Sequence, residues 1–255
     1  MLPWGGGRLE RGPRVIKPGE EWGRPTDATA EIECHGDDQA LAALITTDRA
    51  DPPPAPLVRF FPSGSDLARA VGLANTIAGV NTNLEAGGGV TDRVRDDQPV
   101  RGIELPIDAI SSDLGVAMNC VILGVSPTQL RPYHRRRSIR VCVDGRELFS
   151  GPATSVVIAN GQFVAGADLV PRGHPGDGRL EIQVYALAPG ERGPMRRRLP
   201  TGTHLPHPRI LATSGRVIEI DGLRRPWPVT LDRRSGRAET RLGLSILPSA
   251  LRLLI

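Results

Sequence analysis

Short apolar segments separated by turn residues make up most of the chain. In the first third, two predicted strands, residues 30–34 and 57–61, are each followed by a turn and then by residues with helical spacing, 39–46 and 66–73. Two strands that are each followed by a helix imply a small parallel sheet, because a parallel pair needs a crossover between its strands. A further short strand is predicted at residues 14–17.

From about residue 96 the pattern changes to strands separated by hairpin signals. Asp144-Gly145, Asn160-Gly161 and Asp177-Gly178 each predict a two-residue hairpin turn, because such turns need residues that tolerate positive φ. The predicted strands are residues 116–123, 138–143, 153–159, 180–187, 217–220, 229–231 and 241–247. We therefore expect an α/β plus all-β fold, with a truncated α/β domain over residues 1–95 and an antiparallel β-sandwich domain over residues 96–255.

The amino-acid composition agrees with a globular protein of many short elements. Hydrophobic residues make up 39% and charged residues 24% of the 255 residues, which argues against wholesale disorder. The 30 Gly and 24 Pro residues favour strands and turns over long helices. Cys34, Cys120 and Cys142 are odd in number and lie in apolar surroundings, as reduced buried thiols do.

The sequence predicts a protein without a membrane span or a signal peptide. No apolar run approaches the roughly 18 residues of a transmembrane helix, and the first residues lack a charged start followed by an apolar stretch. We therefore expect a cytoplasmic protein, with at most peripheral contact with a membrane.

Arginine supplies most of the formal net charge of +4. It is concentrated in three runs, at residues 135–137, 196–198 and 233–234. Because the guanidinium fork fits phosphate and carboxylate, ATP, anionic lipid headgroups and nucleic acid are candidate partners, and solvated loops are the alternative. No aromatic residues interleave with these runs, which argues against nucleic acid.

The most specific pattern lies between residues 156 and 182. A strand ends in Asn160-Gly161, a Gly-rich turn leads to Pro171, and Asp177-Gly178 opens the next strand. Three further segments read PSGSDLAR at residues 62–69, WPVTLD at residues 227–232 and LPSAL at residues 247–251. Over most of residues 30–255, the chain resembles the diacylglycerol kinase-like lipid kinases, which are related to the NAD kinases.

The resemblance implies an α/β nucleotide-binding domain followed by a β-sandwich, with ATP and a lipid headgroup in the cleft between them. The implied activity is ATP- and Mg²⁺-dependent phosphorylation of a lipid hydroxyl, in which positioning and charge neutralisation provide the catalysis. Its catalytic residues would be Asp37, as magnesium ligand or general base, and Asp232, near the acceptor hydroxyl. The implied nucleotide-binding residues are Gly36, Gly64, Ser65, Asn160 and Gly161, and the implied metal ligand is Asp177.

Several features of the chain depart from the family pattern, among them the Asn of the second turn, which is Ser65 here in a turn two residues shorter, and one missing N-terminal strand-helix unit. The family's Gly-Gly-Asp-Gly-Thr is His35-Gly36-Asp37-Asp38-Gln39 here, so Asp38 adds a side chain and a negative charge where a glycine amide would approach phosphate. The family's Asp-Gly-Glu is Asp232-Arg233-Arg234, which puts a cation at an acidic position. The alternative function is therefore a catalytically inactive relative that acts as a lipid-, nucleotide- or protein-binding module.

Each candidate residue also has a purely structural interpretation. Asp37 precedes a predicted helix and is a strong N-cap residue, and Ser65 also sits in a capping turn. The Asn-Gly and Asp-Gly pairs are explained by hairpin turns alone. Asp232 lies beside two arginines and is a candidate for an ion pair. His204 and His207 are interpreted as surface residues, because neighbouring prolines prevent the helix that would align them.

Overall fold

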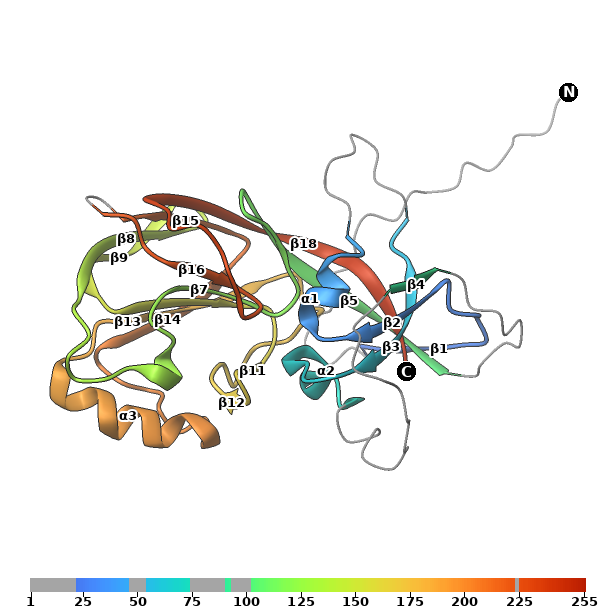
Figure 1. The fold of residues 1–255 in the computed structure, drawn as a ribbon, viewed down its shortest axis with the longest axis horizontal. Coiled ribbons are helices and arrows are strands. Elements are labelled where there is room, and N and C mark those ends of the chain that lie inside the picture. The colour runs from blue at the N-terminus through green and yellow to red at the C-terminus, as the bar shows by residue number, and fades with distance from the viewer. Residues whose placement is uncertain (1–21, 46–53, 74–89, 93–101, 223–224) are drawn as a thin grey trace, which may run out of the picture.

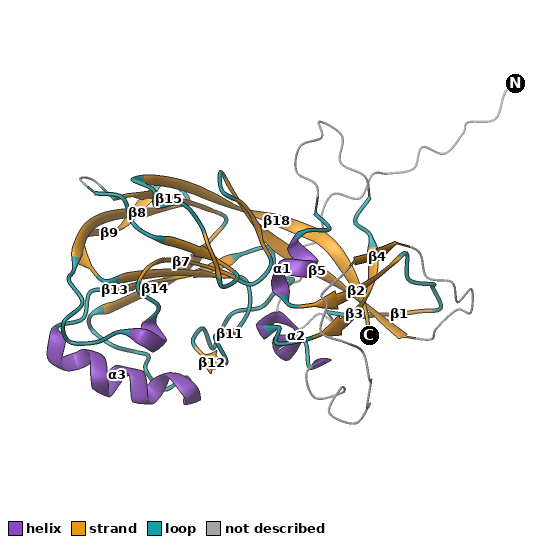
Figure 2. Ribbon diagram, in the orientation of Figure 1, coloured by secondary structure: helices purple, strands orange, loops and turns teal. Residues whose placement is uncertain are grey.

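The computed structural model describes residues 22–45, 54–73, 90–92, 102–222 and 225–255. The strand predicted at residues 14–17 lies outside these ranges. Figure 1 shows a β-sandwich joined to a smaller α/β unit, and Figure 2 shows how few helices accompany the strands.

The α/β unit contains the two predicted strand-turn-helix pairs. Strand β2 (Ile32–Gly36) precedes helix α1 (Asp38–Ala42), and β3 (Leu57–Pro62) precedes α2 (Asp66–Ala70). β2 and β3 pair in parallel, so this prediction is confirmed. Both helices end earlier than predicted; after α2 the chain turns at Gly72, whose φ of 79° is incompatible with a continuing right-handed helix.

A ten-stranded sheet connects this unit to the sandwich. Its long strand β18 (Arg241–Leu254) pairs antiparallel with β5 (Gly102–Ser112), and the end of β18 pairs in parallel with β3. The predicted strand stopped at residue 247; the real one continues, with an irregularity between Leu247 and Leu251 that accommodates Pro248. The domain boundary predicted near residue 95 stays a prediction. Strands β5 and β18 lie after this residue in the chain, yet they belong to the same sheet as β2 and β3.

The sandwich is formed by one end of this sheet and a six-stranded sheet in the order β14-β13-β10-β7-β16-β17. Its core joins inward-facing apolar residues of both layers, among them Ile139, Ile218, Leu244, Val156 and Ile158. Such packing of two antiparallel layers is the expected way to bury alternating apolar residues. The predicted fold class is thus confirmed.

The remaining elements complete the framework. The strands are β1 (Arg24–Thr26), β4 (Val90–Asp92), β6 (Gly115–Ala117), β7 (Cys120–Gly124), β8 (Arg137–Val143), β9 (Arg146–Ala153), β10 (Ser155–Ala159), β11 (Phe163–Val164), β12 (Ala167–Asp168), β13 (Leu180–Tyr185), β14 (Ile210–Gly215), β15 (Val217–Asp221), β16 (Val229–Leu231) and β17 (Arg234–Ser235). The helices are α3 (Arg192–Arg198) and the short 3₁₀ turns η3 (Pro127–Gln129), η4 (Pro189–Glu191) and η5 (Leu199–Thr201). Within the described ranges, no helix combines the length and apolar character needed to cross a bilayer.

One of the three hairpin predictions is confirmed. Asp144-Gly145, with φ of 48° and 76°, joins the antiparallel strands β8 and β9. The prediction was wrong at Asn160-Gly161 and Asp177-Gly178, because β10 pairs with β7 and β13, while β11 pairs with β12. Partners distant in sequence explain both pairs instead: Asn160 donates to the carbonyl of Asp108 (2.7 Å), and the N–H of Gly178 donates to the Asp108 carboxylate (2.7 Å).

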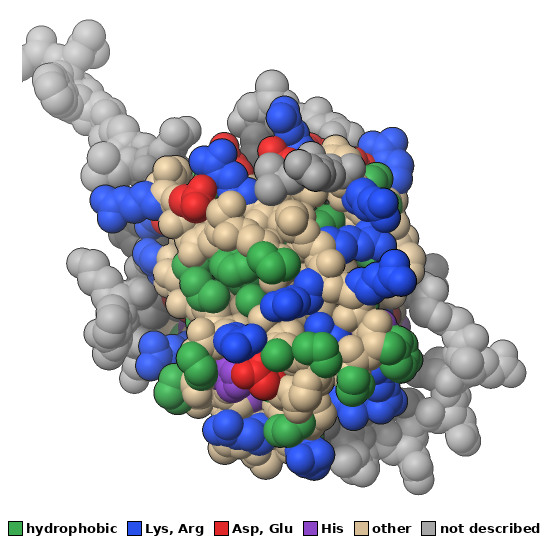
Figure 3. Space-filling model, turned by 90° about the vertical axis from the view of Figure 1, so that its left-hand side faces the viewer, with side chains coloured by type: hydrophobic (Ala, Val, Ile, Leu, Met, Phe, Trp, Pro, Cys, Tyr) green, Lys and Arg blue, Asp and Glu red, His purple; other side chains and the backbone are tan. Residues whose placement is uncertain are grey.

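Helix α3 covers the end of the sandwich that lies away from α1 and α2 (Figure 1). Met195 of α3 and Leu199 are buried in a second apolar cluster together with Tyr185 and Leu187. Figure 3 looks at this end of the molecule, where arginine side chains lie between separate groups of apolar ones.

Candidate functional site

The first candidate turn lies where β2 ends. Gly36 has a φ of 139°, and a Cβ there would lie 2.9 Å from that of Ala40, so glycine is required on both grounds. Asp37 is the N-cap of α1, and its Oδ1 accepts from the backbone N–H groups of Gln39 (3.0 Å) and Ala40 (3.3 Å). Asp37 therefore has the capping role, and a catalytic role for it stays a prediction.

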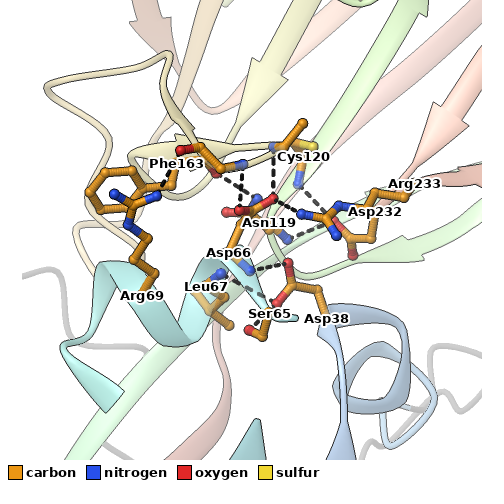
Figure 4. Close-up of polar contacts among 12 residues, drawn as sticks. Asp38, Ser65, Asp66, Leu67, Arg69, Asn119, Cys120, Phe163, Asp232 and Arg233 are labelled. Atoms are coloured by element: carbon orange, nitrogen blue, oxygen red, sulfur yellow. Dashed lines mark hydrogen bonds and ion pairs between the residues drawn. The ribbon is translucent and has the colours of Figure 1, made fainter. Parts of the chain in front are cut away.

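The second candidate turn, at Gly64-Ser65, is filled by the side chain of Asp38. The hydroxyl of Ser65 and the backbone N–H of Leu67 (3.3 Å) both donate to Asp38 Oδ1, and the N–H of Asp66 (3.2 Å) donates to Oδ2 (Figure 4). Asp38 is only 6% exposed. A carboxylate of this chain thus accepts hydrogen bonds from N–H groups in the first turn of α2, which a bound phosphate would otherwise use.

Asp66 fastens α2 to the β11–β12 turn. Its carboxylate accepts from the N–H groups of Ala165 (2.7 Å) and Gly166 (2.9 Å), and from Arg233 Nη2 (2.8 Å). Arg69 donates to the Gly166 carbonyl (2.7 Å) from the same helix. Arg233, whose side chain is 53% exposed, therefore joins this junction and pairs with a residue far away in sequence.

Asp232 is buried and forms a different set of contacts from the predicted ion pair. Its carboxylate accepts from the backbone N–H groups of Met118 (2.5 Å), Asn119 (3.0 Å) and Cys120 (2.8 Å). These N–H groups lie where the predicted strand 116–123 breaks into β6 and β7, so the aspartate replaces a neighbouring strand. The predicted ion pair of Asp232 with its arginine neighbours was wrong, because Arg233 pairs with Asp66.

Burial and mutual repulsion shift the pKa values of the neighbouring carboxyl groups of Asp38 and Asp232. Burial, and then the charge of Asp232, raise the pKa of Asp38 to about 7 despite the hydrogen bond from Ser65. Burial also raises the pKa of Asp232 to about 6, although its three N–H donors lower it. Burial, and then the charge of Asp232, raise the pKa of the Cys120 thiol well above its usual value, so this cysteine stays protonated.

The raised pKa of Asp38 predicts a pH-dependent stability. Its pKa moves from 3.8 in the unfolded chain to about 7 in the folded protein, so its contribution to stability is complete below about pH 4 and is lost as the pH rises through about 7. Asp38→Asn removes this titration. We expect the free energy of unfolding of the variant, relative to that of the parent, to rise by at least about 1.5 kcal/mol between pH 4 and pH 8. Urea denaturation at both pH values measures it, and parallel pH profiles would contradict it.

A cavity of about 300 Å³ opens between α1 and the β16–β17 turn. Its lining residues are Gln39, Ala42, Ala43, Ile45, Gly115, Val116, Leu231, Asp232 and Arg234. Gln39 closes one side, because its side-chain amide donates to the carbonyl of Asp232 (2.7 Å). The cavity thus combines an apolar wall with one exposed cation, Arg234.

Asn160 and Gly161 contact the segment Met118-Asn119, whose N–H groups donate to Asp232. The Asn160 amide donates to the carbonyls of Asp108 (2.7 Å) and Met118 (2.9 Å), and the residue is 1% exposed. A Cβ on Gly161 would lie 2.6 Å from Asn119 Oδ1, so glycine allows a close approach there. This pair supports the loop that binds Asp232, and contact with a nucleotide stays a prediction.

Asp177 belongs to the turn before β13. Its Oδ1 accepts from the N–H of Arg179 (2.9 Å), and burial raises its pKa. Among the residues that the structure describes, no three His, Cys, Asp or Glu side chains gather so that they could hold a metal ion. Asp177 as a metal ligand remains a prediction from the resemblance.

Sequence could have pointed to some of these roles. The Asp232-Arg233 turn has φ values of 43° and 69°, and aspartate tolerates such a conformation better than most residues. Asp38 and Asp66 each follow a good capping residue, but nothing in their spacing shows that one carboxylate would bind the other helix. These contacts join turns that are 27 or more residues apart.

Comparisons with known proteins place this geometry in context. The family model described as "YegS C-terminal NAD kinase beta sandwich-like domain" matches residues 125–255. The chain is similar in structure to "a putative diacylglycerol kinase" from Bacillus anthracis str. Sterne, with a TM-score of 0.63 and 14% identity over 87% of this chain and 75% of that chain. A second structure, named as a diacylglycerol kinase of the same organism, gives a TM-score of 0.59 at 14% identity over the same shares. No curated protein sequence matches significantly.

Proposed function

We propose that this chain, which belongs to the family of the YegS C-terminal NAD kinase beta sandwich-like domain and so to the diacylglycerol kinase-like and NAD kinase superfamily, binds an anionic lipid in its cleft without transferring phosphate. The observation that supports this proposal is the Asp38 carboxylate on the N–H groups of α2.

Asp38 opposes a nucleotide phosphate in two ways. Its side chain occupies the donors that a phosphate would need, and its negative charge repels the phosphate when it is ionised. If the Asp38 side chain moved away, the Ser65 hydroxyl and two backbone N–H groups would each need a new hydrogen-bond acceptor. The residues present therefore do not fit ATP as they stand.

The cavity suits a lipid with an anionic headgroup. Ala42, Ala43, Val116 and Leu231 supply apolar surface, and Arg234 offers a guanidinium that fits phosphate. Ligand sites commonly combine an apolar wall with a few polar groups in this way. We assign the acyl part to the apolar wall and the headgroup to Arg234.

ATP- and Mg²⁺-dependent lipid phosphorylation is the second candidate. The feature that favours it is the position of Asp232 in the lining of the cavity, with Asp37 in the cap of the adjacent helix. For this function the Asp38 side chain would have to leave α2. Transfer of labelled phosphate from ATP to a lipid would support this candidate over the first.

Direct binding of a fluorescent lipid tests the proposed function. Fluorescent phosphatidic acid below its micelle concentration is titrated with the protein and with Arg234→Ala. We expect the variant to bind about tenfold more weakly, because a hydrogen bond to a charged group is lost. Arg237→Ala is the matched control, since Arg237 is exposed and pairs only with Glu239 among the described residues. Equal binding by all three proteins would contradict the assignment.

A further inference from the structure

The segments that carry two of the three arginine runs lie side by side at the end of the sandwich that carries α3. The chain between β7 and β8 reads RPYHRRR at residues 131–137, and α3 reads RGPMRRR at residues 192–198. We call the exposed residues Arg131, Tyr133, Arg135, Arg136, Arg197 and Arg198 the distal surface. Figure 3 shows this end, where cationic side chains predominate over acidic ones.

A buried arginine fixes the two segments side by side. Arg192, at the start of α3, is 1% exposed, and its Nη1 donates to the carbonyls of Arg131 (2.9 Å), Pro132 (2.9 Å) and His134 (2.6 Å). Its Nη2 donates to the Leu187 carbonyl (3.3 Å). Because a buried guanidinium is costly, this anchor implies that the loop is held in one conformation.

The anchor adds positive charge beneath a surface that is already cationic. Burial, and then the charge of Arg136, lower the pKa of Arg192. Between residues 187 and 209 the sole acidic residue is Glu191, and it pairs with Arg209. Among the described residues, no carboxylate forms an ion pair with an arginine of the distal surface. Such self-repulsion weakens the folded state, and an anionic partner relieves it.

One exposed aromatic ring lies just before the first of these arginine runs. Tyr133 is 77% exposed, and its ring touches that of His134 edge-on, with centroids 4.7 Å apart. A ring with an apolar body and a polar tip is the side chain that proteins place at the level of lipid headgroups. Binding of single-stranded nucleic acid, in contrast, uses several aromatic rings along a basic groove.

We propose that the distal surface docks this protein on the surface of an anionic phospholipid bilayer, with its arginines on lipid phosphates and Tyr133 in the headgroup layer. Arginines from two segments that Arg192 holds together present their charges to many phosphates at once. The proposal is independent of the ligand in the cleft.

Vesicle sedimentation tests the docking. The protein is mixed with vesicles of phosphatidylcholine alone, or with added phosphatidylglycerol, at low and high salt. We expect binding to the anionic vesicles only, and a weaker one at high salt. Arg136→Glu should lower the partition coefficient about thirtyfold, which corresponds to about 2 kcal/mol for a change of two charges. Arg24→Glu, an equal charge change on β1, is the matched control and should bind like the parent.

Two more measurements separate this proposal from its alternatives. Tyr133→Trp should show a blue-shifted emission on anionic vesicles. Arg136→Glu should leave the binding of fluorescent phosphatidic acid below its micelle concentration unchanged, because Arg136 does not line the cavity, and this distinguishes docking from cleft binding. Equal binding to neutral vesicles, equal losses in Arg136→Glu and Arg24→Glu, or tighter binding to single-stranded DNA without a Tyr133→Trp response to vesicles would overturn the proposal.

Discussion

Replacing Asp232 by alanine is expected to lower the free energy of unfolding by at least about 3 kcal/mol. The substitution leaves the buried N–H groups of Met118, Asn119 and Cys120 without their acceptor, and each buried unsatisfied donor costs about 1–3 kcal/mol. It also places alanine at a φ of 43°, which aspartate tolerates better. Urea denaturation followed by circular dichroism measures the change.

Two controls separate the role of the carboxylate from a general effect at turns. Asp232→Asn keeps one acceptor oxygen and tolerates the positive φ, so we expect a smaller loss than with alanine. Asp113→Ala changes an exposed aspartate in the neighbouring β5–β6 turn and should alter stability by less than about 0.5 kcal/mol. An alanine variant of Asp232 as stable as the parent would show that these three hydrogen bonds do not stabilise the fold.

Replacing Asp38 by glycine is expected to raise the affinity for Mg-ATP at least about tenfold. The substitution frees the Ser65 hydroxyl and the N–H groups of Asp66 and Leu67, and it removes a charge that repels phosphate. Tenfold corresponds to about 1.4 kcal/mol, a modest gain for three freed donors and one removed charge. Asp38→Asn keeps a side chain in place without its charge, so we expect an intermediate affinity.

Local patterns were sufficient to predict much of the fold. Strands β2, β3, β8 and β15 lie where short apolar segments between turn residues predicted them. Strands β8 and β15 each bury one face against the sandwich core. The parallel pairing of β2 and β3 followed from the two strand-turn-helix units. The return of β18 to β3 did not, since pairing between residues about 195 apart leaves no local signal.

The site was predicted less completely than the fold. Sequence motifs placed the candidate site at two turns, which follow β2 and β3, and the structure brings Asp38 from the first to Ser65 in the second. The orientation of Asp38 and the three donors of Asp232 depend on backbone groups from distant segments, which residue types do not encode. Arg233 was expected to form an ion pair with Asp232, yet its long side chain reaches Asp66 instead.

Isothermal titration calorimetry of the parent and of Asp38→Gly with Mg-ATP is the most direct test of the central claim, that Asp38 closes the phosphate site. We predict no saturable heat for the parent at millimolar Mg-ATP and a saturable isotherm for Asp38→Gly. A parent that binds Mg-ATP as tightly as Asp38→Gly, and passes labelled phosphate to a lipid, would contradict the account.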